Sequence, residues 1–205
     1  MKGVLYGLLV LSRLCVAQSS GPPCDGQPGC DAIYAECPVP LTQLNEVDTL
    51  PDFRADANRM LLTGVVYRPD GKTPAPDVVL YVYHTNQQGI YPKRPNLPPV
   101  GRWHGYLRGW VRTNYRGEYR FYTCKPTPYP NGGIPAHIHI HAKEPGKPDY
   151  WLDDIEFNND VLLTPAERRK REQRGGDGIV SPTNQNGLIV ARRNVILGQH
   201  IPGYR

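Results

Sequence analysis

The stretch Pro128-Tyr129-Pro130-Asn131-Gly132-Gly133-Ile134-Pro135-Ala136-His137-Ile138-His139 is the part of this 205-residue chain that most strongly indicates a fold and a site. Side chains alternate between the two faces of a β-strand. If the end of this stretch forms a strand, His137 and His139 lie on one face, where they can bind a single metal ion. Tyr129 stands between two prolines, which restrict the backbone on both sides of it. The stretch therefore predicts a strand with a candidate metal site on one face.

A second tyrosine occurs about forty residues earlier, in Gln88-Gly89-Ile90-Tyr91-Pro92. Two phenols and two imidazoles suit ferric iron, because a hard, highly charged cation favours anionic oxygen ligands and can deprotonate a phenol whose free pKa is about 10. His141 continues the strand alternation, so a three-histidine zinc site with an open position is an alternative. Otherwise His141 packs beyond the metal or hydrogen-bonds to a ligand.

Further motifs surround these residues in a consistent order. They are Thr63-Gly64-Val65-Val66-Tyr67, Tyr83-His84-Thr85-Asn86-Gln87-Gln88-Gly89-Ile90-Tyr91, Gly109-Trp110-Val111-Arg112-Thr113-Asn114, Gly117-Glu118-Tyr119-Arg120-Phe121-Tyr122-Thr123 and Lys125-Pro126-Thr127-Pro128-Tyr129-Pro130. Over roughly residues 60 to 160 the chain resembles the intradiol ring-cleavage dioxygenases, the family that includes protocatechuate 3,4-dioxygenase and the catechol 1,2-dioxygenases. A lone His-x-His is weak evidence, but both tyrosine motifs in order before it make the resemblance specific.

The resemblance implies a non-haem Fe(III) site with Tyr91, Tyr129, His137 and His139 as its ligands. It implies that a catechol binds as a dianion and displaces a hydroxide and the axial ligand Tyr129, each of which carries off a proton. Both atoms of O2 then enter the ring, which opens between the two hydroxyls to a muconate-type diacid. No external reductant is needed, so the reaction suits an exported enzyme.

Two positions depart from the family pattern. The family usually has an arginine three residues before the first ligand histidine, where this chain has Ile134, and often has a glutamine where we align Asp154. A carboxylate in place of a neutral donor opposes an anionic substrate. We hypothesise that an arginine of the 92–109 insertion or the strand after it supplies a replacement charge; the candidates are Arg102, Arg108 and Arg112.

Short strands separated by turns predict an all-β chain: an antiparallel β-sandwich or barrel-like core with long loops. The 21 glycines and 22 prolines agree with a loop-rich architecture. The expected strands are Leu61 to Tyr67, Val78 to His84, Trp110 to Thr113, Glu118 to Thr123, Ala136 to Ala142, Gly187 to Val190 and Asn194 to Leu197. One surface helix is expected in the C-terminal half, from a capping box at Thr164-Pro165-Ala166-Glu167 to Gly175-Gly176.

The N-terminal region predicts export. Residues 1–17 are typical of a secretory signal peptide, residues 18–60 of an arm held by disulfides, and residues 61–205 of the catalytic domain. An even number of cysteines after cleavage predicts two disulfides, with Cys124 joined to the arm and the connectivity open. The four disulfide candidates are Cys24, Cys30, Cys37 and Cys124.

The favoured function is an exported dioxygenase, secreted or periplasmic, that acts on a catechol-class aromatic with O2. The alternatives are a secreted iron- or catecholate-binding protein that has lost turnover, and a β-sandwich interaction module without metal. The net charge of +5 does not indicate nucleic-acid binding, and no apolar run is long enough to span a membrane. The family assembles into oligomers, but the chain has no visible self-association motif.

Overall fold

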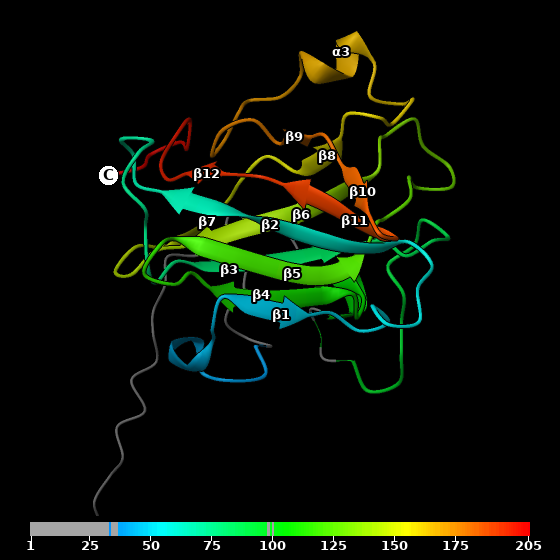
Figure 1. Cartoon of the computed structure of the whole chain (residues 1–205), viewed down its shortest axis with the longest axis horizontal. Coiled ribbons are helices and arrows are strands. Elements are labelled where there is room, and N and C mark those ends of the chain that lie inside the picture. The colour runs from blue at the N-terminus through cyan, green and yellow to red at the C-terminus, as the bar shows by residue number, and fades with distance from the viewer. Residues whose placement is uncertain (1–32, 34–36, 98, 100) are drawn as a thin grey trace, which may run out of the picture.

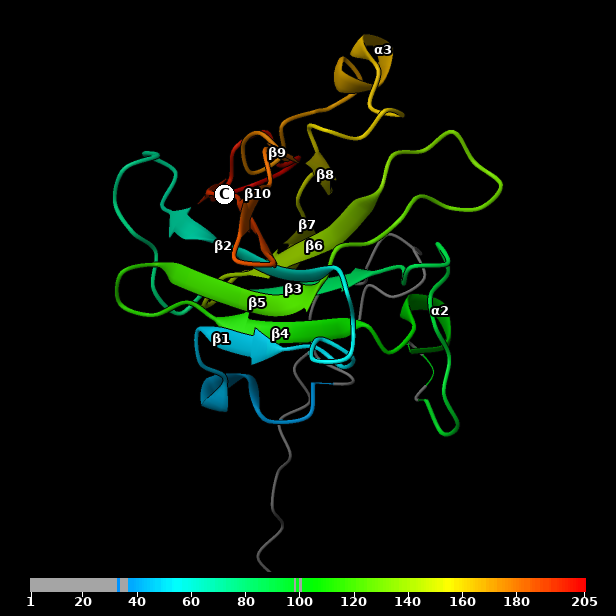
Figure 2. The same cartoon turned by 45° about the vertical axis from the view of Figure 1, so that its right-hand side comes forward.

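A computed structural model describes residue 33 and residues 37–97, 99 and 101–205. Its twelve strands form two six-stranded sheets that pack face to face as a β-sandwich, and its helices are short (Figures 1 and 2). The predicted all-β sandwich is confirmed. Several strand pairs are parallel, however, so the sheets are mixed and not purely antiparallel as predicted.

The first sheet is built around the long strand β2 (Arg59–Tyr67). Its order is β1-β5-β2-β11-β10, and β12 pairs with the end of β2 that lies beyond β11. The other strands of this sheet are β1 (Val47–Thr49), β5 (Glu118–Cys124), β10 (Thr183–Gln185), β11 (Leu188–Arg192) and β12 (Val195–Ile196).

The second sheet carries the candidate site and is centred on β6 (His137–Lys143). Its order is β4-β3-β6-β8-β9, and β7 also pairs with β6. The other strands are β3 (Val79–His84), β4 (Arg108–Arg112), β7 (Asp149–Trp151), β8 (Ile155–Phe157) and β9 (Ile179–Val180). Helical turns occur at η1 (Leu41–Gln43), α2 (Gly101–His104) and α3 (Pro165–Arg168).

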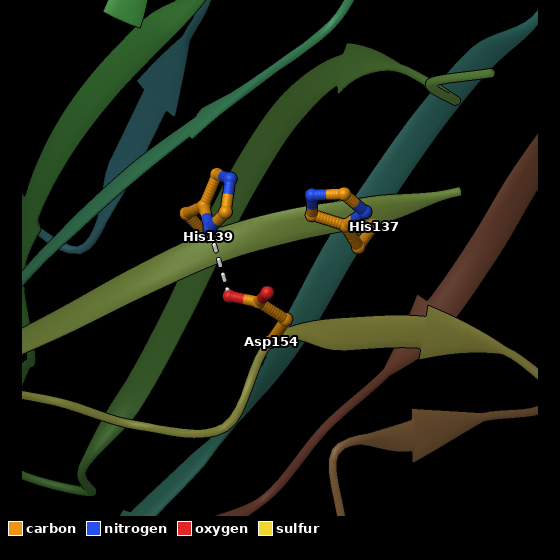
Figure 3. A group of neighbouring side chains, drawn as sticks. All are labelled: His137, His139 and Asp154. Atoms are coloured by element: carbon orange, nitrogen blue, oxygen red, sulfur yellow. Dashed lines mark hydrogen bonds and ion pairs between the residues drawn. The ribbon is translucent and has the colours of Figure 1, made fainter. Parts of the chain in front are cut away.

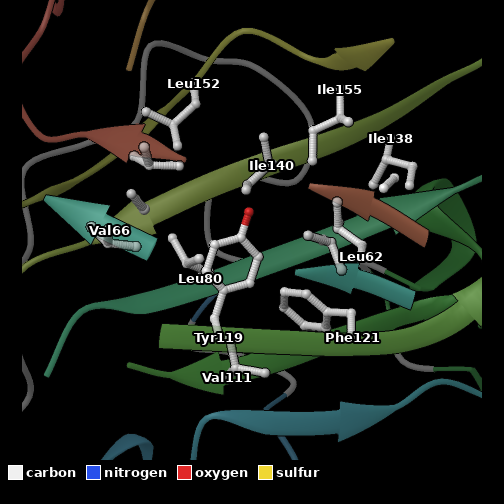
Figure 4. Close-up of a cluster of buried hydrophobic side chains, with 14 of the residues drawn as sticks. Leu62, Val66, Leu80, Val111, Tyr119, Phe121, Ile138, Ile140, Leu152 and Ile155 are labelled. Atoms are coloured by element: carbon white, nitrogen blue, oxygen red, sulfur yellow. The ribbon is translucent and has the colours of Figure 1, made fainter. Parts of the chain in front are cut away.

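The main hydrophobic core lies between the sheets (Figure 4). Strand β2 alternates buried and partly exposed residues, with Leu62 and Val66 fully buried, as expected for a strand with one face on the core. From the second sheet, Leu80, Ile138 and Ile140 meet them. At about 25 cal/mol per Å² of apolar surface, this burial is the main force that holds the sheets together.

A second apolar layer covers the outer face of the second sheet. There Tyr81 and Trp110 are buried with Ile33 and Val79, and the partly buried Cys37, Leu41, Leu44 and Tyr83 pack against them. Strand β3 is therefore buried on both faces, and on the outer face of β6 His137 and His141 are buried while His139 is half-buried. The outward residues of β6, which include the histidines, lie beside this aromatic layer and not in the sandwich core.

All seven predicted strands occur within a few residues of their predicted bounds. The strands that the sequence did not reveal, β1 and β7 to β10, have two or three residues, too few to show an alternating pattern. The predicted helix is wrong beyond its first turn. Thr164 caps it by accepting a hydrogen bond from Glu167 N at 3.2 Å, but α3 ends at Arg168. The residues after it lack an apolar face and instead turn toward β8.

The predictions for the N-terminal region fall partly outside the residues that the structure describes. The proposed signal peptide, with Cys24 and Cys30, lies outside the described residues. Within the described residues Cys37 and Cys124 are free thiols, and because Cys24 and Cys30 lie outside those residues, the two disulfides stay a prediction. Burial raises the pKa of Cys124 to about 12, and a protonated thiol is a poor nucleophile for disulfide exchange.

Gly64 marks the closest approach of β2 to the chain after β11. A Cβ atom there would overlap the carbonyl oxygen of Arg193, which also accepts a hydrogen bond from Tyr119 Oη at 2.8 Å. We expect Gly64→Ala to lower the free energy of unfolding by about 1–3 kcal/mol, because neither backbone can retreat. Denaturant unfolding measures this.

Gly133 is the matched control, since nothing lies within 4 Å of a Cβ atom built there. Gly133→Ala should change the free energy of unfolding by less than about 1 kcal/mol. Equal effects of the two substitutions would show that the contact between β2 and residue 193 is not tight.

Candidate functional site

Strand β6 places its histidines by register. His139 lies opposite Tyr83 of β3, and His137 lies opposite Glu156 of β8. Directly opposed residues in antiparallel strands share a face, so these four side chains project from the outer face of the sheet. His137 is buried, with 7% of its surface exposed, and His139 is half-buried.

The two tyrosines come from loops that are fastened to each other. Thr85 Oγ1 donates to the carbonyl of Thr127 at 2.8 Å, and Thr127 Oγ1 donates to the carbonyl of Asn86 at 3.1 Å. Gly89, with φ of 71°, passes so close to the carbonyl oxygen of Pro128 that a Cβ atom would overlap it. The motif that contains Tyr91 is thus held against the one that contains Tyr129.

Four potential ligand atoms converge as a result. Tyr91 Oη lies 2.5 Å from Tyr129 Oη and 2.7 Å from His139 Nε2. Tyr129 Oη lies 3.2 Å from His137 Nε2. The structure thus brings together all four residues that the resemblance implied as ligands: two phenol oxygens and two imidazole nitrogens.

The other nitrogen of each imidazole is occupied. His137 Nδ1 lies 2.7 Å from the carbonyl oxygen of Pro135, which can only accept, so Nδ1 carries the proton. His139 Nδ1 lies 2.9 Å from Asp154 Oδ1 (Figure 3). A neutral ring that carries its proton on Nδ1 offers the lone pair of Nε2 on the side of the two phenols, which is the arrangement that a metal-ligating histidine requires.

The protonation of the site agrees with this. Burial lowers the pKa of His137, so its ring is neutral. Burial would raise the pKa of Asp154, but His139 holds it below its usual value through charge and hydrogen bonding, so Asp154 accepts as a carboxylate. Burial raises the pKa of both Tyr91 and Tyr129, and the hydrogen bond between them raises that of Tyr91 further. Neither phenol ionises unless a cation lies close by.

Among His, Cys, Asp and Glu side chains of the described residues, His137, His139 and Asp154 form the candidate metal cluster, with ligand atoms within 4.8 Å of one another. Two histidines and one carboxylate are also a ligand set typical of non-haem iron. Asp154, however, bonds the Nδ1 edge of His139, whereas the phenols face Nε2. One ion bound at Nε2 lies on the phenol side, which makes Asp154 the group that orients His139.

An aromatic stack supports His139 from the side. The Tyr83 ring stacks on two imidazoles: its centre lies 4.5 Å from the centre of the His139 ring and 3.6 Å from that of the His104 ring. His104 belongs to α2 of the 92–109 insertion, and its Nδ1 lies 2.8 Å from Tyr81 Oη. Sequence reasoning did not assign this role to Tyr83. The signal was available, because Tyr83 keeps the strand alternation that faces the predicted metal strand.

His141 lies beyond the site, as one of the two interpretations predicted. It is buried beside the rings of Tyr81 and Tyr83, and burial lowers its pKa to about 4. Among the described residues it is not part of the metal cluster. The three-histidine zinc alternative is therefore not supported.

A cavity of about 550 Å³ opens beside the four potential ligands. Tyr129, His137, His139 and Asp154 line it, and Ile134, half exposed, lines it too. Tyr91 is not among the lining residues. The remaining lining residues are Trp151, Leu152, Asp153, Glu156, Glu167, Lys170, Arg171, Glu172 and Arg174.

The three arginines proposed as a replacement charge do not line this cavity. Arg112 pairs with Asp77 at 2.7 Å, and the Arg108 guanidinium lies 5.5 Å from the centre of the Trp110 ring. Arg102 sits on α2. The basic groups of the cavity come instead from residues 170–174, the segment that the sequence predicted to be a surface helix.

The fold and site together define a β-sandwich protein with a candidate mononuclear metal centre of tyrosine and histidine ligands. No protein-family model matches the chain. It is 27% identical over 156 residues to catechol 1,2-dioxygenase 1 of Acinetobacter lwoffii. This match covers 62% of this chain and 48% of that protein. It is also 27% identical over 136 residues to the chlorocatechol 1,2-dioxygenase of Burkholderia cepacia, a match that covers 58% of this chain and 50% of that protein. The chain spans about half the length of these curated relatives.

Solved structures share the fold. The dioxygenase domain of a dioxygenase–carbohydrate-binding protein fusion from Streptomyces sp. SirexAA-E matches with a TM-score of 0.55 at 18% identity, over 79% of this chain and 95% of that one. Chlorocatechol 1,2-dioxygenase from Pseudomonas putida matches with a TM-score of 0.55 at 21% identity, over 79% and 67%. The sequence relatives support the resemblance to the intradiol ring-cleavage dioxygenase family, and the solved structures share the fold.

If Asp154 orients His139, the two possible substitutions of it will behave differently. Asp154→Ala removes the acceptor for His139 Nδ1–H and should lower metal affinity about 10- to 100-fold. Asp154→Asn keeps an oxygen that can accept this proton and should have a smaller effect. Competition with a chelator measures both.

Asp153→Asn is the control, because the Asp153 carboxylate accepts from Gln173 N at 2.7 Å and does not contact His139. It should leave metal affinity unchanged. If Asp154→Asn loses as much affinity as Asp154→Ala, the carboxylate is itself a ligand.

Proposed function

We propose that this protein is a non-haem Fe(III) dioxygenase that cleaves a catechol between its two hydroxyls, with both atoms of O2 entering the product. The observation that carries the proposal is the convergence of Tyr91, Tyr129, His137 and His139 beside an open cavity. Similarity to the intradiol family supports it, because the sequence relatives are catechol and chlorocatechol dioxygenases.

The donor set fits ferric iron. Two phenols 2.5 Å apart with raised pKa values ionise only next to a strong cation, and Fe(III) favours two anionic oxygens with two neutral imidazoles. Tyr91, Tyr129, His137 and His139 would hold the ion. The chemistry that bound Fe(III) would supply is the withdrawal of electron density from a catechol, which would make the ring reactive toward O2.

The two tyrosines have different roles in this proposal. Tyr129 lines the cavity and Tyr91 does not. With iron bound, Tyr129 would therefore be the ligand on the substrate side, and its phenolate would be placed to accept the proton of a catechol hydroxyl. Asp154 and Tyr83 hold His139 in orientation from two sides. Trp151 and Ile134 give the cavity apolar surface against which an aromatic ring can pack.

Export is part of the proposal and rests on the sequence of residues 1–17 alone. The reaction uses O2 and substrate without an external reductant, so it is compatible with an extracellular or periplasmic location. No helix within the described residues has the length and apolar character that crossing a membrane would require.

The second candidate is an iron- or catecholate-binding protein with the same ligands and no turnover. The departures Ile134 and Asp154 favour it, because they place an aliphatic side chain and a carboxylate where an anionic substrate would be held. A protein of this kind would bind catechol without consuming O2.

The decisive measurement is the visible spectrum of the iron-loaded protein with catechol, first without O2. We expect a phenolate-to-iron absorption band that moves to longer wavelength with catechol, because catecholate then joins the ligands. Admission of O2 should consume one O2 per catechol and bleach the shifted band. A shifted band without O2 uptake would identify the binding protein, and a colourless protein would refute both.

Tyr129→Phe tests the proton acceptor. We expect turnover to fall about 10²- to 10⁴-fold, the usual contribution of a general base. Tyr115→Phe is the matched control, since Tyr115 is 77% exposed and does not line the cavity. Oxygen uptake with catechol measures both, and equal rates for the two variants would remove Tyr129 from the mechanism.

A further inference from the structure

The segment after α3 forms a charged wall of the cavity. Three basic side chains line the cavity from this segment, and each is paired with a carboxylate. Lys170 pairs with Glu167 at 2.6 Å, but the Lys170 side chain is 64% exposed. Arg174 pairs with Glu172 at 2.7 Å, but the Glu172 side chain is 62% exposed. Exposed pairs of this kind hold their side chains weakly.

Arg171 differs from the other two. Its Nε and Nη2 each lie 2.5 Å from one oxygen of Glu156, which is a two-point contact between guanidinium and carboxylate. The Glu156 side chain is 4% exposed and that of Arg171 22% exposed. This pair fixes both the position and the plane of the guanidinium.

Glu156 also fixes where the guanidinium lies relative to the metal site. It is the cross-strand partner of His137, so both side chains project from the same face of the second sheet. Arg171 lines the same cavity as Tyr129, His137 and His139. In the described part of the chain, no hydrogen bond occupies Arg171 Nη1, so a donor remains for an oxygen anion.

Stability alone does not account for this pair. Burying a carboxylate and a guanidinium costs desolvation energy that their attraction repays only in part, and an apolar pair of similar volume is often as stable. The other cations of the cavity, Lys170 and Arg174, are held only by exposed ion pairs, while Arg102, Arg108 and Arg112 do not line it and Ile134 is aliphatic. A cation held rigidly beside an anion-binding metal site is what this pair provides.

We propose that Arg171 is a substrate-binding residue, held by Glu156, whose guanidinium contacts the anionic oxygen of a catecholate in the cavity. The inference rests on the proposed function and adds a recognition group to it. It assigns to the 169–174 segment a role in substrate binding, in place of the solvated helix that its sequence predicted.

A purely structural role for the pair predicts different results. If Arg171 only anchors its segment to β8, its loss should lower the melting temperature and leave the affinity of a folded variant for catechol unchanged. A single Arg171→Met would leave Glu156 buried without its partner and risks unfolding. The double variant E156Q/R171M removes both charges together and avoids that outcome.

The experiment is an anaerobic titration of the iron-loaded full chain with catechol, followed through the phenolate-to-iron band. We expect E156Q/R171M to retain iron and its starting spectrum but to need roughly 10- to 100-fold more catechol for half-saturation, as for the loss of a charged hydrogen bond. Arg171→Lys keeps the charge without the two-point contact and should lie between E156Q/R171M and wild type. Arg169→Met, which removes an exposed charge from the same segment, is the control and should match wild type.

Half-saturation of folded E156Q/R171M within twofold of wild type would overturn the assignment. If the double variant fails to fold, Arg171→Lys decides: unchanged affinity overturns the assignment, and weakened affinity at an unchanged melting temperature supports it. A wild-type protein whose band does not respond to catechol would instead refute the proposed function itself, and with it the role of Arg171.

Discussion

Strand β6 packs one face against the sandwich core, and most of the site follows from this constraint. Its inward residues, Ile138 and Ile140, belong to the sandwich core, so the alternation of the strand fixes the opposite direction for His137 and His139. A register shift of one residue would exchange the two sets and place imidazoles in the apolar core. Core packing thus determines on which face the histidines lie, and pairing with β3 and β8 determines their neighbours.

Polar groups at the site are then arranged by the need to satisfy buried hydrogen-bonding atoms. Each imidazole Nδ1 has an acceptor, Pro135 O or Asp154, and this leaves Nε2 for the phenols. The tyrosine loops reach that point because threonine side chains tie them to each other's backbone. The two Nη atoms of the buried Arg193 also find acceptors, the carbonyls of Asp153 and Arg174 in the cavity wall, whereas its Nε has no hydrogen-bond partner among the described residues.

Several features could be predicted from sequence because local chemistry determines them. Long strands such as β2 and β6 show their alternation over seven or more residues, and the cap at Thr164 works as its motif indicates. Short strands such as β10, with three exposed residues, have no pattern to read. The prediction of a longer helix after Thr164 is wrong for a different reason. Its polar residues gain more from contacts such as Arg171 with Glu156 than from helical backbone bonds in solvent.

By itself, the sequence determined the identity of the four converging side chains, their order along the chain and the strand that carries two of them. Only the tertiary structure decided which arginine reaches the cavity, and that Tyr83 and His104 support His139 by stacking. The physical reason is that strand alternation and capping act between residues close in sequence. The contacts of Arg171, Asp154 and His104 join segments that meet only when both sheets and their loops have packed.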